Sequence, residues 1–422
     1  GFYKFHLRVY TFGSKKENKF RQWIKRIGEP PVILDTTLVT QSTEQMQLFL
    51  KKKGYFEASA SDSVVYKVKT NWNGKKIKKQ KASVYHNLTP KKPWEVKQIG
   101  YAIFDDSLRP VIRDYSKNLS IKRGSNYDEY NLSDEREKMD KFMKNRGYYN
   151  FGRQYIEYKV DTHLGNHKVN YQINIKNSTE KRKTATGTDT LIQTNHQKFY
   201  IKQIIVKSAG NEAIIAAEDT LKFKGYDFVN YAGNVIRPKV IARSIFFDKG
   251  DLYRLKNIEY TYSRLSALGV FSTINIEVNP DPAHPNGTDL IAIITLSMSP
   301  RYSISVETEG TNRGGNLGVN SRVNFTNKNT FKGAEALNIG VFGGLEAQQT
   351  NNDLFEDQTE QINEALPFNT LEYGADVTLK VPDLLIPKFR SIIPNYSNPS
   401  TEIGTAYNYQ YRGKKNCTYF RG

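Results

Sequence analysis

The histidines are the first candidates for chemistry in this chain, because imidazole can ligate a metal or transfer a proton near neutral pH. Six histidines are present, and the one close pair, His163 and His167, brackets Leu164-Gly165-Asn166. A zinc site needs at least three protein ligands, and no third ligand accompanies this pair at a suitable spacing. Because Gly-Asn is typical of a turn, we interpret the pair as exposed imidazoles on a hairpin turn and expect no metal.

Other motifs of catalysis are missing from the sequence. The run Gly310-Thr311-Asn312-Arg313-Gly314-Gly315 lacks the Gly-Lys-Ser/Thr ending of a phosphate-binding loop, and a tight turn between strands explains it better. Asp134 and Glu135 are predicted in the first turn of a helix, where they offset its dipole. The single cysteine, Cys417, excludes a disulfide framework. We therefore expect no catalytic residue, no cofactor and no enzyme.

A run of lysines is the most marked charge feature. The net charge is +19, and residues 1–100 hold 21 Lys and Arg against 7 Asp and Glu. The basic patch on one predicted hairpin consists of Lys67, Lys69, Lys75, Lys76, Lys78, Lys79 and Lys81. The sequence shows no zinc-ligand spacing, no stacking platform and no helix-turn-helix pattern beside this charge, so we expect no nucleic-acid partner. Lipid headgroups, an acidic protein partner, or a solvated hairpin whose lysines discourage edge pairing stay open.

The elements around these residues follow a repeated pattern. Three predicted amphipathic helices run into a glycine followed by aromatic residues: Leu50 to Gly54-Tyr55-Phe56, Met143 to Gly147-Tyr148-Tyr149, and Leu265 to Gly269-Val270-Phe271. Such a glycine predicts a helix end at positive φ, and the aromatic residue is expected to fold back onto the helix. The predicted structural corners are Gly54, Phe56, Gly147, Tyr148, Gly269 and Phe271.

Strand patterns flank each corner and predict a β-α-α-β-β unit, which makes a two-layer α+β module with a three-stranded sheet. The predicted modules are 1–92, 93–177 and 197–299, with residues 178–196 as an irregular linker or insertion rich in Thr, Lys and Asn. The first strand of the first module falls either before Gly1 or within Phe5 to Tyr10, and the sequence leaves both options open.

From Arg301 the pattern changes to strands alone, with apolar residues alternating against polar ones. The candidate strands contain Tyr302 to Thr308, Leu317 to Phe325, Leu337 to Val341, Leu371 to Val381 and Ile403 to Tyr411. Strands of about ten residues with aromatic residues near their ends are long enough to cross a bilayer when they are tilted. A soluble sandwich is the alternative. No apolar run is long enough for a spanning helix.

Together these patterns resemble the POTRA domains and barrel of the BamA/TamA superfamily, most closely its TamL-type lipoprotein branch. The stretches that carry the resemblance are Gly1 to Tyr10, Trp23 to Asp35, Asp161 to His167 and Arg237 to Tyr253. The resemblance covers about residues 1–412. It implies three POTRA-like modules followed by the first strands of an outer-membrane β-barrel at 300–412.

The resemblance also implies a function: an outer-membrane assembly and insertion factor, a surface-antigen relative with its modules in the periplasm. Its partners would be outer-membrane lipid, unfolded outer-membrane proteins and a TamB-like periplasm-spanning protein. Extended clients would add a strand to a module edge. The implied edge residues are Val64, Val65, Tyr66, Ile156, Tyr158, Val160, Ile274, Ile276 and Val278. The implied first, gate-forming barrel strand contains Tyr302, Ile304 and Val306.

Several features depart from that family. The lumenal VRG-aromatic motif, a signal sequence and a lipid-acceptor cysteine near Gly1 are absent, and five strands cannot close a barrel. We therefore expect a fragment of a longer protein. Residues 413–422 lose the alternation and are predicted to be an atypical tail. A secretion pore of the same superfamily and a purely periplasmic scaffold stay open as alternative functions.

Overall fold

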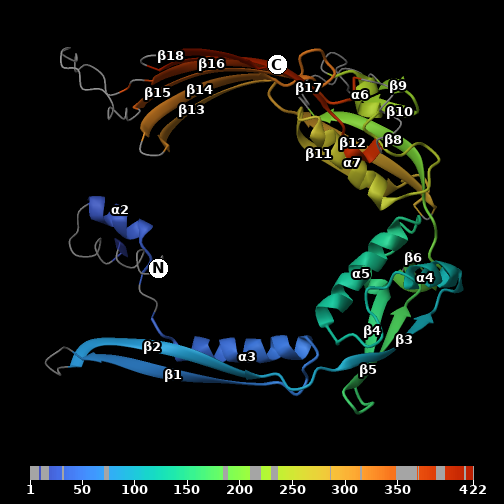
Figure 1. The fold of residues 1–422 in the computed structure, drawn as a ribbon. Helices are drawn as coiled ribbons and strands as arrows, with labels where there is room; N and C mark the ends of the chain where they lie inside the picture. The colour runs from blue at the N-terminus through green and yellow to red at the C-terminus, as the bar shows by residue number, and fades with distance from the viewer. Residues whose placement is uncertain are drawn as a thin grey trace. The chain divides into compact units, whose positions relative to one another are not determined.

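The computed structural model describes residues 9–10, 19–30, 33–70, 76–183, 189–209, 220–229, 236–285, 287–313, 316–347, 368, 370–385, 395–412 and 415–421 (Figure 1). The chain divides into two compact units. Unit one holds residues 1–139 and 152–179, and unit two holds residues 140–151 and 180–422. Within the described ranges, no helix has the length and apolarity needed to cross a membrane.

The first module in unit one pairs helices with a long hairpin. Its elements are α2 (Lys19–Ile27), α3 (Thr36–Lys52), β1 (Ser59–Thr70) and β2 (Lys76–Thr89). The Asp35 carboxylate caps α3 by accepting the N–H of Thr37 at 2.8 Å. Val9 and Tyr10 are helical, so a strand reaching Tyr10 is wrong, whereas Phe5 lies outside the described residues.

The second module has the predicted β-α-α-β-β order. Its elements are β3 (Glu95–Ile103), η1 (Asp106–Leu108), α4 (Arg109–Ser116), α5 (Glu129–Lys144), η2 (Arg153–Tyr155), β4 (Ile156–Asp161) and β5 (Lys168–Ile175). The sheet order is β3-β5-β4, with β3 parallel and β4 antiparallel to β5. Alternate residues Val169, Tyr171 and Ile173 of the central strand are buried, which gives β5 its core face.

The third module, in unit two, has a larger sheet than predicted. Its elements are β8 (Tyr200–Ala209), β9 (Thr220–Phe223), β10 (Tyr226–Val229), α6 (Pro238–Ala242), α7 (Leu255–Ala267), β11 (Phe271–Pro280) and β12 (Asp289–Met298). The order β11-β12-β8-β10-β9 adds a hairpin to the expected three strands. Lys224 and Gly225 both have positive φ, 50° and 84°, and form the tight turn of that hairpin.

Two expectations of irregular chain are wrong. Residues 178–196 contain β6 (Ser178–Lys183) and β7 (Asp189–Thr194), which form a two-stranded sheet. The tail 413–422 contains β18 (Lys415–Arg421), which pairs with the preceding strand from Arg412↔Lys415 to Ala406↔Arg421. Main-chain hydrogen bonds hold a strand without any need for alternating side chains, so composition misled the prediction at both places.

A six-stranded antiparallel sheet follows the third module. Its strands, in spatial and chain order, are β13 (Tyr302–Arg313), β14 (Asn316–Asn327), β15 (Ala336–Ala347), β16 (Thr370–Val381), β17 (Thr401–Arg412) and β18, with η4 (Asn395–Ser397) before β17. The five strands expected from the alternation are confirmed. β13 and β18 form the two edges of this sheet in the part of the chain that the structure describes.

Two of the three corner glycines, Gly54 and Gly147, join consecutive modules. Gly54, Gly147 and Gly269 have φ values of 91°, 98° and 69°, so the predicted positive φ is confirmed. The Gly54 carbonyl accepts the N–H of Trp94 at 2.9 Å, and the Gly147 carbonyl accepts the N–H of Phe199 at 2.9 Å. Gly54 and Gly147 therefore turn their carbonyls toward the residue that leads into the next module.

Phe56 of the first corner contacts the next module, and so does Tyr149, which follows the predicted corner residue Tyr148, whereas Phe271 of the third corner packs against the core of its own module. Phe56 lies 5.2 Å from Trp94 and 5.0 Å from Tyr127, measured between ring centroids. Tyr149 likewise lies 5.5 Å from Phe199 and 5.1 Å from Tyr253. Equivalent residues thus build two equivalent joints, because the aromatic partner lies three residues after the glycine of the next module's turn in both.

Gly147→Ala should loosen the second joint. A Cβ there would meet the Leu252 side chain, with Cγ at 3.0 Å, whereas a Cβ at Gly250 meets nothing within 4 Å. The two glycines have similar φ, 98° and 92°, so Gly250→Ala is a matched control for backbone strain. We expect Gly147→Ala to destabilise the joint by about 1–3 kcal/mol more than the control.

Hydrogen exchange on the full chain measures this difference. The joint residues 143–151 and 199–201 should exchange roughly tenfold or more faster in Gly147→Ala than in Gly250→Ala. Equal exchange in both variants would contradict a packed glycine joint.

Candidate functional site

The predicted client-binding strands lie at sheet edges in the described chain. β1 pairs only with β2, β4 only with β5, and β11 only with β12. Their side chains differ in exposure, since Val65 and Tyr66 are exposed, whereas Ile156 is buried. β13, which carries Tyr302, Ile304 and Val306, is also an edge strand. The structure therefore places all four predicted strands where a further strand could add.

The main-chain groups of these edges alternate in direction. In β4, Lys176 donates its N–H to the Tyr155 carbonyl at 2.9 Å, which fixes that pair as hydrogen-bonded. Because hydrogen-bonded and non-hydrogen-bonded pairs alternate in an antiparallel ladder, Ile156, Tyr158 and Val160 direct their N–H and C=O groups away from β5. These groups form the outward ladder that an added strand would bind.

The same alternation applies to β11 and β13. The N–H of Asp281 binds the Asp289 carbonyl, and the N–H of Lys328 binds the Arg301 carbonyl, each at 2.9 Å. These pairs fix the phase of both ladders. The outward main-chain groups then belong to Ile274, Ile276 and Val278 in β11 and to Tyr302, Ile304 and Val306 in β13.

One of these edges is partly occupied. The Tyr149 hydroxyl donates a hydrogen bond of 2.6 Å to the Val278 carbonyl, which is one of the outward groups of β11. The second aromatic residue of the Gly147 corner therefore covers one end of the third module's edge. Sequence analysis did not anticipate this contact, because Tyr149 precedes Val278 by 129 residues. The edges of β1, β4 and β13 have no such cover among the contacts of the described chain.

Among the described residues β2 pairs only with β1, so β2 is a second edge of the first module's sheet. In module two the equivalent central strand, β5, has β3 on its other side. An apolar groove of about 610 Å³ runs along α3 and reaches β2 at one residue; its lining is Leu38, Gln41, Ser42, Gln45, Met46, Phe49, Leu50 and Leu88.

The six-stranded sheet has one apolar face. Its pairing aligns apolar residues in rows across the strands, and the central row is Val306, Val323, Val341, Ala375 and Tyr407. The neighbouring row is Ile304, Phe325, Ile339, Val377 and Thr405. Ile304 and Val306 are 71% and 70% exposed, so nothing in the described chain covers this face at the β13 edge.

Aromatic residues lie toward both ends of this apolar face. Tyr302 and Phe325 stack at one end with centroids 6.0 Å apart, and Tyr373 and Tyr409 lie 5.1 Å apart toward the other. The apolar rows from Tyr302 to Gly310 extend over roughly 27 Å along the strand, which a tilt of about 35–45° reduces to about 19–22 Å along the membrane normal. Lipid-facing bands of membrane strands are about 25 Å tall and carry aromatic residues at both boundaries.

The opposite face of the sheet is polar. Arg322 of β14 forms an ion pair with Asp376 of β16, passing over Gly340 of the intervening β15. A Cβ at Gly340 would collide with the Arg322 guanidinium and lie 2.7 Å from an Asp376 carboxylate oxygen. The glycine therefore leaves the room in which the two charges meet across three strands.

The remaining predicted motifs show no catalytic arrangement. No cluster of three or more His, Cys, Asp or Glu side chains placed to hold a metal occurs in the described part of the chain. Gly165, Asn166 and His167 all have positive φ, as in the predicted turn. Gly310 to Arg313 belong to β13. In the basic patch Lys75 lies outside the described residues, as do the side chains of Lys67, Lys69, Lys76, Lys78, Lys79 and Lys81.

One acid of α5, Glu135, is buried, which its position in the sequence does not predict. Glu135 lies in the second turn of α5, contrary to the first turn predicted, and is 1% exposed. Its carboxylate accepts hydrogen bonds from the Tyr115 hydroxyl and from the N–H of Ser120 at 3.1 Å. Burial, followed by the Glu135 charge, raises the pKa of Tyr101 to about 12. The hydrogen bonds of Glu135 connect α5 to α4 and to the segment after it, and no residue spacing in the sequence predicts them.

No family model matches this sequence, and no curated protein matches it. Among solved structures, BamA from Haemophilus ducreyi lacking POTRA domains 1–3 is similar at 12% identity and a TM-score of 0.37, over 76% of this chain and 52% of that chain. The chain thus spans about half the length of that structure. POTRA domains 3–5 of Haemophilus influenzae BamA give 9% identity and a TM-score of 0.33, over 68% of this chain and 92% of that chain.

CdiB from Acinetobacter baumannii is also similar, at 10% identity and a TM-score of 0.29, over 92% of this chain and 65% of that chain. At these identities and scores the likenesses carry no argument about function. Function is therefore inferred from the edges and faces of the sheets.

Gly340→Val should break the cross-strand ion pair. The added side chain would displace Arg322 from Asp376, and losing a charged hydrogen bond should cost about 1.5–3 kcal/mol. Gly343→Val is the control, since a Cβ there meets only the Glu372 carbonyl at 3.8 Å. In detergent, the midpoint temperature of thermal unfolding, followed by circular dichroism, should fall for Gly340→Val and change little for the control. The reverse order would contradict the role given to Gly340.

Proposed function

We propose that this protein assembles outer-membrane β-barrel proteins, with its modules in the periplasm and its six-stranded sheet in the outer membrane. The observation that carries the proposal is the sheet: one exposed apolar face, one polar face and a free edge strand, β13, directly after an α+β module. In the proposal, the modules receive unfolded client proteins and the sheet edge templates their strands.

The apolar face supports a lipid environment. Soluble proteins rarely expose a contiguous apolar patch larger than a few hundred Å², because water around it is costly. Rows of Val, Ile, Leu and aromatic residues cross five strands here without a covering layer in the described chain. Hydrocarbon would cover them, while the Arg322–Asp376 face would line an aqueous lumen.

The edges support client capture by strand addition. An extended peptide can bind the outward N–H and C=O groups of β4 through main-chain hydrogen bonds, which are largely independent of its sequence. A factor that handles many clients requires such tolerance. In hydrocarbon an unpaired strand is prohibitively costly, so β13 would hold a client strand in a paired state during insertion.

We further infer a TamA- or TamL-like role, with lipid anchoring and a TamB-like partner as part of the same proposal. The support is the sequence resemblance in the modules and the chain order of modules before sheet. A secretion pore would share the membrane sheet, whereas a periplasmic scaffold would keep the sheet in water. The following two experiments separate these functions.

Val306→Lys should prevent membrane insertion. Val306 lies in the central row of the apolar face, where a buried lysine would cost about 2–4 kcal/mol in a bilayer. Ser305→Lys places the same charge on the polar face of the same strand and should insert normally. Flotation of refolded full chain with phosphatidylcholine vesicles measures insertion. If both variants remained soluble and folded without lipid, the scaffold function would replace the membrane assignment.

Val160→Pro should weaken client binding. Proline removes an outward N–H of β4 while keeping an apolar side chain, and Val160→Ala keeps the N–H as a matched control. We expect roughly three- to tenfold weaker binding of an unfolded outer-membrane strand peptide to Val160→Pro than to Val160→Ala. Crosslinking to the full chain gives the affinity, and exchange protection of β5 checks folding. Equal binding by both folded variants would rule out strand addition at β4. That result would favour the secretion pore over the assembly function.

A further inference from the structure

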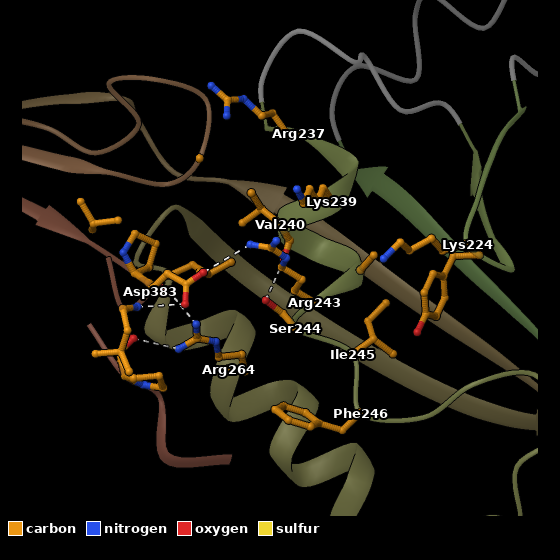
Figure 2. Close-up of a pocket in the computed structure, with 18 of the residues that line it drawn as sticks. Lys224, Arg237, Lys239, Val240, Arg243, Ser244, Ile245, Phe246, Arg264 and Asp383 are labelled. Atoms are coloured by element: carbon orange, nitrogen blue, oxygen red, sulfur yellow. Dashed lines mark hydrogen bonds and ion pairs between the residues drawn. The ribbon is translucent and has the colours of Figure 1, made fainter. Parts of the chain in front are cut away.

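A basic cavity lies within unit two, between the third module and one end of the six-stranded sheet (Figure 2). Its volume is about 920 Å³. Six basic side chains line it against three acidic ones. The basic residues are Lys224, Arg237, Lys239, Arg243, Lys249 and Arg264, and the acidic residues are Asp248, Glu335 and Asp383. The lining therefore has an excess of positive charge.

The three acids of the cavity are bound by groups of the chain itself. Asp383 pairs with Arg243 at 3.3 Å, Asp248 accepts the Tyr226 hydroxyl at 2.6 Å, and Glu335 accepts the N–H of Gly333 at 2.8 Å. Burial, followed by the bond to Asp248, raises the pKa of Tyr226, which keeps this hydroxyl a donor. Each acid is thus already bound by a donor of the chain itself.

The lysines of the cavity are available to a ligand. Lys224, Lys239 and Lys249 are exposed, and none has an acidic partner within 4 Å among the residues that the structure describes. Figure 2 shows Lys224 directed toward the α6 side of the cavity, where Lys239 lies. Lys224 is held there by the hairpin turn, in which it has a φ of 50°. An anion entering the cavity would meet ammonium groups from separate segments.

The cavity wall is a built junction. Arg264 of α7 donates to the Pro382 carbonyl at 2.6 Å and to the Pro399 carbonyl at 3.4 Å, and Figure 2 shows it beside the Asp383 segment. Ala334 from the β14–β15 connection is 2% exposed within the core of the third module. These contacts fix the sheet end against α6 and α7, so the cavity has a defined shape.

The position of the cavity suggests the source of the anion. Leu379 belongs to the last apolar row of β16, and Val381, which lines the cavity, follows it by two residues, about 7 Å along the strand. In a bilayer the headgroup layer extends about 5–8 Å beyond the hydrocarbon on each side. If the apolar face lies in hydrocarbon, as proposed above, the cavity opens at headgroup depth.

We propose that this cavity binds the phosphate-bearing headgroup of an anionic phospholipid on the module side of the membrane. Lys224, Lys239 and Lys249 contact the phosphate, while Arg243 and Arg264 hold the wall. A bound lipid joins the third module to the sheet end and fixes the depth of the sheet in the bilayer. The inference rests on the membrane placement of the sheet.

The test uses the full chain in detergent, titrated with short-chain phosphatidylglycerol, short-chain phosphatidylcholine or inorganic phosphate. Calorimetry should show preferential binding of phosphatidylglycerol. Lys224→Gln/Lys239→Gln should bind it roughly 30-fold more weakly. Each lysine near an anionic headgroup contributes about 1 kcal/mol to the binding free energy, and the two losses add. Lys207→Gln/Lys256→Gln removes the same charge from module residues outside the cavity and should bind normally. Added salt should weaken the wild-type binding.

Three outcomes would overturn the inference: equal binding of both lipids, equal weakening in both double variants, or inorganic phosphate binding as tightly as the lipid and displacing it. The last result would indicate a site for free phosphate. Because this titration needs no vesicles, its failure leaves the flotation result for Val306→Lys and Ser305→Lys unaffected. A failed flotation with intact lipid binding would instead reject the membrane function and the depth argument.

Discussion

The glycine joints control how this chain passes from one module to the next. Gly54 and Gly147 adopt a φ that other residues rarely adopt, and this conformation turns their carbonyls toward Trp94 and Phe199. The aromatic residue behind each glycine then packs on the next module. One consequence reaches an edge, because Tyr149 of the second joint also binds the Val278 carbonyl. Joint and sheet edge are therefore coupled in the third module, and a strand added to β11 would have to compete with Tyr149 for the Val278 carbonyl.

The two-residue period of a strand couples faces to edges. In β4, β11 and β13 the apolar residues that face a core or the open apolar surface are also the residues whose main-chain groups point outward. A strand added at β13 would therefore pair with residues of the lipid-side rows. Its own apolar residues would fall in register with those rows if it has the same alternation. Pairing and sorting of a client strand by face would occur in one step.

Local signals predicted what depends on local physics. Alternation found the five strands from β13 to β17, and helix-Gly-aromatic patterns found the positive φ of Gly147. Lys224-Gly225 between alternating residues is a turn signal for the β9–β10 hairpin, and the prediction of a three-stranded sheet did not use it. Other features depend on contacts between residues distant in sequence. These are the hydrogen bonds of Glu135, the hydrogen bond from Tyr149 to the Val278 carbonyl, and the ion pair over Gly340. The cavity was also unpredictable, because its lysines belong to segments that only the fold brings together.

Depth-dependent quenching along β14 tests the central claim, that the six-stranded sheet lies in a membrane. Single cysteines at Val319, Asn320, Val323 and Asn324, in a Cys417→Ser background, would carry a fluorophore in vesicles that contain spin-labelled lipid. Val319 and Val323 lie on the apolar face, and Asn320 and Asn324 lie on the polar face. The account predicts strong quenching at the two valine positions and weak quenching at the two asparagine positions. Uniformly weak quenching, with the chain folded, would contradict it.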